Sequence, residues 1–299
     1  MDHPENRENT SARQPAQNPQ PPRRQHRPFP TVGDCFALLG IVLGVQVLVG
    51  GLLSLVAGFA GFDPRTADPQ ALGRYNCLLY LTAMSLGLAG VLLYCRRRGA
   101  AGHLVGWSTA RLHPLLLLWS CVLLFAVSIV IEPLLRLLPD YTPAVGRGPW
   151  AFVMAVLLAP LFEELLCRGV VLGALRTRYG VVAAWLGSSL FFGVLHLVPV
   201  SVVNACIIGL ILGYVYLATG SIWASVLLHA VNNAAAYALL TLAGEQRLLI
   251  DWIGSRTLYG VLYAAALAVA GVSVWKMAGT LRRMKAAGKT DSEKFSAES

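Results

Sequence analysis

Long apolar stretches alternate with short polar connections along this chain. A helix needs about 20 predominantly apolar residues to cross the hydrocarbon core of a membrane, so each stretch is predicted to form one spanning helix. The predicted spanning segments are at about 35–60, 72–94, 114–137, 150–176, 180–198, 201–218, 222–243 and 257–278. The predicted fold class is therefore all-α, a polytopic membrane helical bundle with about eight transmembrane helices.

The composition agrees with this pattern. Hydrophobic residues make up 56% of the chain and charged residues only 13%, whereas a typical soluble domain has about 25% charged residues. A soluble protein of this length would need more charge on its surface, so most of the chain is predicted to lie in the membrane.

Basic residues gather in the connections on one side of the predicted bundle, and they account for much of the net charge of +9. They precede the first segment and follow the second, the fourth and the last. The set is Arg13, Arg23, Arg24, Arg27, Arg96, Arg97, Arg98, Arg111, Arg176, Arg178, Arg282, Arg283, Lys285 and Lys289. Cytoplasmic connections are enriched in Lys and Arg, so we expect a multi-pass protein of the cell membrane with both termini in the cytoplasm.

Residues 1–33 differ from the rest because they are rich in Pro, Gln, Asn and Arg. They have too few apolar side chains to offset the entropy lost on ordering, so they are predicted to be a disordered tail. The tail lacks the features of a cleaved signal peptide, and the first spanning helix is expected to insert without cleavage. No aromatic residue is interleaved with the arginines, which argues against a nucleic-acid partner.

Ionisable and amide side chains interrupt the later apolar segments. The paired carboxylates Glu163 and Glu164 lie in APLFEELLCRGVV, His196 lies in FFGVLHLV, and His229 and Asn233 lie in LLHAVNNAAA. Such groups cost several kcal/mol inside a membrane unless they face a cavity or one another. We therefore expect them to meet at one buried site, in a polar cavity open to the cytoplasmic half of the bilayer.

Helix geometry gives the two glutamates different roles. Glu164 and Arg168 are four residues apart and share a helix face, so an ion pair is predicted between them. Glu163 points about 140° away from Arg168 and is free to face a cavity and act on water. Asn233 lies one turn above His229 on the same face, whereas Asn232 should point elsewhere. The alternatives are an ion-pair network without catalysis and histidines that only pack.

Peptide hydrolysis would use these side chains well, because it needs an activated water, a base and donors for the oxyanion. A glutamate serves as the base, the histidines position the water or bind a divalent metal, and Asn233 donates to the oxyanion. Upright helices would separate His196 from His229 by more than about 10 Å. Tilt, or a fifth segment that starts below the surface after a turn at 176–180, is needed to close this gap.

Three motifs in order along the chain resemble the type II CAAX prenyl protease and bacteriocin-processing family of intramembrane proteases, the CPBP family. They are E-E-x-x-x-R (Glu163, Glu164, Arg168), F-x-x-x-H (Phe192, His196) and H-x-x-x-N (His229, Asn233). The resemblance covers about residues 148–243, including LFEELLCRGVVLGALR and GSIWASVLLHAVNN. Each motif alone is weak, whereas the ordered set is specific.

The resemblance implies a hydrolase, because members of this family are multi-helix membrane enzymes described as glutamate-dependent or metal-dependent endopeptidases. It implies that Glu163 is the base, that His196 holds the attacking water, and that His229 with Asn233 stabilises the oxyanion or binds metal. Glu164 and Arg168 would be supporting residues. The cofactor stays open, and a divalent metal such as zinc is one alternative, with a ligand set drawn from Glu163, His196, His229 and Asn233.

The resemblance also leaves the substrate open. Some members remove the last three residues after a prenylated cysteine, and others are linked to bacteriocin maturation or self-immunity. The implied partners are a peptide or protein substrate, lipidated or not, and membrane lipids. Two non-enzymatic alternatives remain: a transporter or proton relay, and an immunity or scaffold protein that retains the fold.

These observations divide the chain into five parts. They are a disordered cytoplasmic tail (1–33), a scaffold of N-terminal transmembrane helices (34–147), a CPBP-like catalytic core (148–243), the last transmembrane helix (244–280) and a basic cytoplasmic tail (281–299).

Small side chains are interpreted as packing residues. The six cysteines are dispersed without C-x-x-C spacing, so they are predicted to be apolar fillers. Pairs of glycines with G-x-x-x-G spacing are predicted to pack helices within the bundle rather than to form a dimer interface. These pairs are Gly40 with Gly44, Gly169 with Gly173, and Gly209 with Gly213.

Overall fold

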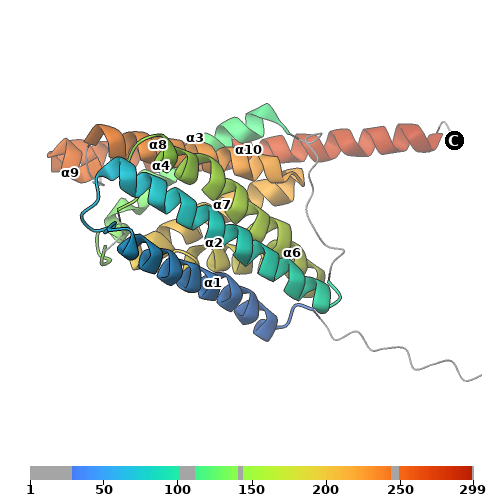
Figure 1. Ribbon diagram of the computed structural model, residues 1–299. Coiled ribbons are helices and arrows are strands. Elements are labelled where there is room, and N and C mark those ends of the chain that lie inside the picture. Colours follow the sequence, from blue (N-terminus) through green and yellow to red (C-terminus); the bar gives the residue numbers. More distant parts are fainter. Residues whose placement is uncertain (1–28, 101–111, 141–143, 244–248, 298–299) are drawn as a thin grey trace, which may run out of the picture.

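A computed structural model describes residues 29–100, 112–140, 144–243 and 249–297, with side chains up to residue 284. The predicted disordered tail lies almost entirely outside these ranges. In the described part every regular element is helical, as predicted, and Figure 1 shows the helices gathered into one bundle.

The first two helices form an antiparallel hairpin along one side of the bundle, α1 (Val32–Phe59) and α2 (Pro69–Arg97) (Figure 1). Thr31 and Asp34 form a reciprocal capping box at the start of α1. Asp68 caps α2 by accepting from the backbone N–H groups of Gln70 and Ala71. The third helix, α3 (Pro114–Leu135), packs against the last helix and against α7.

The glutamate-bearing helix contains two widened π-helical turns. Its parts are α4 (Pro149–Phe152), η1 (Val153–Leu158), α5 (Ala159–Glu164), η2 (Leu165–Leu172) and α6 (Gly173–Val194). Pro160 has no N–H to donate to the carbonyl four residues earlier, which disfavours a regular α-helical turn and agrees with the widened turn of η1 before it. The short segment α5, which carries both glutamates, is thus flanked by the kind of turn that often marks functional sites.

The helix α6 breaks at Gly180, where φ is 80° and ψ is 176°. Within the described ranges, seven helices are long and apolar enough to span a membrane, and the fourth of these covers Pro149–Val194. The break divides it into two rods, 149–179 and 181–194, which correspond to the predicted fourth and fifth segments. The second rod is about 21 Å long at 1.5 Å per residue, too short to cross about 30 Å of hydrocarbon.

The remaining helices are α7 (Pro199–Thr219), α8 (Ile222–Ala243), α9 (Leu249–Ile253) and α10 (Arg256–Ala297). The prediction of a helix through residue 198 is wrong, because α6 ends at Val194. Leu197 has φ 61°, and Val198 is extended, as expected for a residue before Pro199. His196 therefore lies in a tight turn. Figure 1 shows α10 (orange to red) continuing beyond the bundle.

Glycines allow α6 and α7 to pack closely. An added Cβ at Gly193 would meet Cys206 Sγ and lie 2.8 Å from the Val202 carbonyl, and one at Gly209 would lie 3.0 Å from the Phe192 ring. The predicted internal packing is therefore confirmed for Gly209. It is wrong for the pair Gly40 and Gly44, because an added Cβ at either glycine has nothing within 4 Å.

The two ends of the bundle have their own ion pairs. At one end, Arg98 at the end of α2 binds Asp34 at the start of α1, with an Nε–Oδ1 distance of 2.9 Å. Near this end Arg178 donates to the Pro30 carbonyl at 3.0 Å. At the other end Arg136 pairs with Asp251 at 3.4 Å. Arg98 after α2 and Arg178 before Gly180 thus both bind at the start of α1 at one end.

Candidate active site

The two glutamates lie at the centre of a polar network in the bundle. Glu163 Oε1 accepts from the Tyr80 hydroxyl at 2.9 Å. Glu164 Oε1 accepts from Arg168 Nη1 at 3.0 Å and is 3.0 Å from His229 Nδ1. His229 Nε2 lies 3.8 Å from Glu163 Oε2, so the imidazole stands between the two carboxylates. Residues from α2, α5, η2 and α8 therefore converge.

The two glutamates differ in exposure. Glu164 and Arg168 are both fully buried, at 0% side-chain exposure, whereas the Glu163 side chain is 14% exposed. The predicted ion pair between Glu164 and Arg168 is present. Glu163 is the carboxylate that water can reach, because the network leaves it partly open.

The buried ion pair sets the orientation of His229. A carboxylate paired with a guanidinium is ionised and can only accept hydrogen bonds, so His229 Nδ1 must be the donor to Glu164. The other ring nitrogen, Nε2, then faces Glu163. Glu164 therefore acts as a positioning residue for the imidazole, as carboxylates commonly do for histidines.

Arg168 links this network to two further helices. Its Nη2 donates to the Gly209 carbonyl of α7 at 2.8 Å, and its guanidinium lies 4.9 Å from the centre of the Phe192 ring of α6. Glu164 Oε2 and Arg168 Nε have no hydrogen-bond partner among the described residues. Gly209 is needed here because a side chain at this position would press on Phe192.

His196 reaches the network through Phe192. Its Nδ1 is 3.0 Å from the Phe192 carbonyl, and its ring packs edge-on against the Phe192 ring at 5.1 Å. His229 packs edge-on against the same ring at 5.4 Å. The short rod 181–194 and the turn after it thus place His196 on the same aromatic ring as His229. The sequence predicts that upright helices would hold the two histidines at different depths in the membrane.

Asn233 lies one turn along α8 from His229 and binds a different part of the glutamate-bearing helix. Its Nδ2 donates to the Ala155 carbonyl in η1 at 2.9 Å. The adjacent Asn232 Nδ2 donates to Asn233 Oδ1 at 3.3 Å. The orientation of the Asn233 amide is therefore fixed from both sides.

A metal site does not form around these side chains in this structure. Across the described ranges, no three His, Cys, Asp or Glu side chains converge on a position that could hold a metal ion. Of the alternative ligand set, Glu163 and His229 lie side by side, whereas His196 joins through Phe192 and Asn233 is bound to Ala155. We therefore derive no chemical step through a metal.

Tyr80 is the site residue that sequence reasoning missed. It comes from α2, in the half of the chain that carries no family motif, and its hydroxyl contacts Glu163 directly. A signal was present, because Asn76, Tyr80 and Met84 recur every four residues and so share one face of α2.

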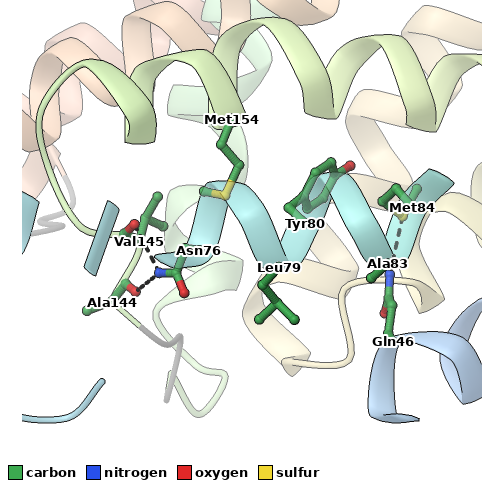
Figure 2. Close-up of a pocket in the computed structure, with 9 residues that line it drawn as sticks. All are labelled: Gln46, Asn76, Leu79, Tyr80, Ala83, Met84, Ala144, Val145 and Met154. Carbon is green, nitrogen blue, oxygen red and sulfur yellow. Dashed lines mark hydrogen bonds between the residues drawn. The ribbon is translucent and has the colours of Figure 1, made fainter. Parts of the chain in front are cut away.

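That face of α2 lines a pocket of about 340 Å³. Gln46 of α1, the 144–145 connection and Met154 of η1 complete its lining (Figure 2). The pocket extends from the middle of α2 towards its Pro69 end, the end opposite Arg98. The sequence predicts a polar cavity open to the cytoplasmic half of the bilayer, the half beside the arginine-rich connections. This pocket lies instead in the opposite half of the bundle.

Comparison with known proteins agrees with the predicted resemblance. Residues 146–235 match the family model described as type II CAAX prenyl endopeptidase Rce1-like. No curated protein and no solved structure matched the chain. The matched range contains all six predicted site residues, and with the apolar spanning helices it identifies a multi-pass membrane protein.

Replacing Arg168 by methionine should destabilise the bundle strongly. The change leaves the buried Glu164 carboxylate without its counter-ion, and breaking a buried pair in this way costs about 3–5 kcal/mol. The double variant Glu164→Gln/Arg168→Met should recover part of this loss, since no unpaired charge remains. Unfolding followed in detergent measures the effect.

The matched control for this prediction is Arg65→Met. Arg65 pairs with Asp63 at the surface, where its side chain is 89% exposed, so stability should not change measurably. Equal stability of Arg168→Met and the wild type would show that the buried pair does not support the bundle.

Proposed function

We propose that the protein is an intramembrane endopeptidase, because residues 146–235 match the Rce1-like model of type II CAAX prenyl endopeptidases. The observation that carries the proposal is the placement of His229 between the partly open Glu163 and the buried Glu164. A purely structural ion pair would need neither a second carboxylate nor an imidazole beside it.

In the proposed reaction Glu163 is the general base. It takes a proton from a water molecule as the water oxygen bonds to the carbonyl carbon of the scissile amide. The carbon–nitrogen bond then breaks as this proton passes from Glu163 to the leaving nitrogen, giving a new carboxyl and a new amino terminus. The 14% exposure of the Glu163 side chain supports this role, because a base must be reached by water.

His229 and Asn233 are proposed to donate hydrogen bonds to the oxyanion. His229 Nε2 faces Glu163 and is placed to donate to the oxyanion when it carries a hydrogen, and Glu164 holds the ring in this orientation through Nδ1. Asn233 uses one N–H on Ala155 and has a second one to donate. His196 is proposed to hold the attacking water.

The proposed substrate is a peptide that ends in a prenylated cysteine followed by three residues, as the name of the matched family indicates. Unmodified peptides, as in bacteriocin processing, are the second substrate class to test. A proton relay or a scaffold built on the same residues would cleave neither.

Cleavage should require Glu163 and His229. The purified protein in detergent is incubated with a farnesylated peptide of this type and with its unmodified counterpart, and products are identified by mass spectrometry. Glu163→Gln and His229→Ala should each lower the rate at least about 100-fold, because general bases and oxyanion donors typically contribute that much.

Glu132→Gln is the matched control, because Glu132 is a glutamate of another helix, α3, whose carboxylate accepts from the Leu249 N–H. It should retain wild-type activity. Equal activity of all three variants and the wild type would remove Glu163 and His229 from the mechanism.

We also propose that both termini are cytoplasmic. The grouping of Arg98 and Arg178 with the start of α1 at one end supports this orientation, since basic residues mark the cytoplasmic side.

Protease treatment of membrane vesicles tests the orientation. Epitope tags at both termini should be digested in inside-out vesicles and protected in right-side-out vesicles. Digestion of either tag in right-side-out vesicles would contradict it.

A further inference from the structure

Two partly buried side-chain amides line the pocket beside Tyr80. Gln46 lies near the middle of α1, which is apolar enough to span a membrane, and Asn76 lies on the pocket face of α2. Polar side chains inside a membrane are costly, and where they are kept they commonly bind something.

The hydrogen bonds of these amides leave capacity for a ligand. Asn76 Nδ2 donates to the carbonyls of Ala144 and Val145, each at 3.1 Å, and Figure 2 shows its carbonyl oxygen on the opposite side. Gln46 Nε2 donates to Met84 Sδ at 3.5 Å, and a thioether is a weak acceptor. Asn76 therefore offers an acceptor, and Gln46 offers a donor and an acceptor.

The spacing of the amides fits an extended chain. Asn76 and Met84, the partner of Gln46, are eight residues apart on α2, which is about 12 Å along the helix axis. An extended peptide rises about 3.3 Å per residue, so about four residues span this distance. Tyr80 lies midway, lines the pocket and donates to Glu163, so a chain in the pocket would lie against the side chain that binds the proposed base.

We propose that this pocket holds about four residues of the peptide substrate in an extended conformation, with Gln46 and Asn76 paired to its backbone. The proposal rests on the proposed function, because it places the substrate against Tyr80, which binds the proposed base Glu163. The volume of about 340 Å³ falls at the lower end of the range of about 300–1,000 Å³ for ligand pockets. Leu79 and Met154 contact the substrate side chains, and Tyr80 acts as a positioning residue for Glu163.

Cross-linking tests the pocket without relying on cleavage. The photoreactive residue benzoylphenylalanine replaces Leu79 in a Glu163→Gln background, which binds but does not cleave. The probe is a fluorescent peptide ending in farnesylated cysteine and three further residues. Cross-linking should occur from position 79 and not from position 81, because Leu81 is outside the pocket lining and 40% exposed.

Kinetics gives a second readout. Gln46→Leu should raise KM about 2–10-fold with little change in kcat, which corresponds to one lost hydrogen bond of about 0.5–1.5 kcal/mol. Leu79→Trp should raise KM by filling the pocket, whereas Leu81→Trp should not. The thermal stability of Gln46→Leu should not fall, since its partner is only a thioether.

The outcomes separate this proposal from the proposed function. Peptide cleavage by the wild type without a cross-link from position 79 would overturn the pocket and leave the peptidase intact. A cross-link from position 79 without cleavage by the wild type would support the pocket and contradict the peptidase. Cross-links from position 79 to lipid alone would show that the pocket holds an acyl chain, which overturns the proposal.

Discussion

The buried ion pair between Glu164 and Arg168 is the interaction on which the site depends. Both side chains are fully buried, and each charge would be expensive in this environment without the other. Each member of the pair also contacts other residues of the site. Glu164 orients His229, while Arg168 holds the Gly209 carbonyl and covers Phe192. One charge pair therefore fixes the positions of α5, η2, α6, α7 and α8 around Glu163.

Breaks in helical regularity bring the site residues together. The break at Gly180 shortens the rod before His196, and the turn through Leu197 follows its end at Val194, so that both histidines meet at Phe192. The π-helical turns flank the glutamates. Close packing of α6 on α7 at Gly193 and Gly209 then places the Gly209 carbonyl beside Arg168.

Much of this arrangement could be predicted from the sequence, because apolar length and i, i+4 spacing are local properties. The helical class, all the spanning segments except the fifth, the ion pair of Glu164 with Arg168 and the contact of Phe192 with His196 follow from them. Long-range contacts could not be predicted in this way. The tyrosine of α2 and the carbonyl partners of Asn233 and Arg168 depend on how distant helices pack. The turn after Val194 was missed because apolar residues continue through it.

The most direct test of this account is the tautomer of His229 in the membrane. Solid-state NMR of protein labelled with ¹⁵N at histidine, with His229→Gln to assign its signals, reports which ring nitrogen carries hydrogen. The account predicts a protonated Nδ1 hydrogen-bonded to a carboxylate, with a signal that changes in Glu164→Gln. A His229 ring that carries hydrogen only on Nε2 would contradict it, because Glu164 would then have no hydrogen bond with which to orient the imidazole.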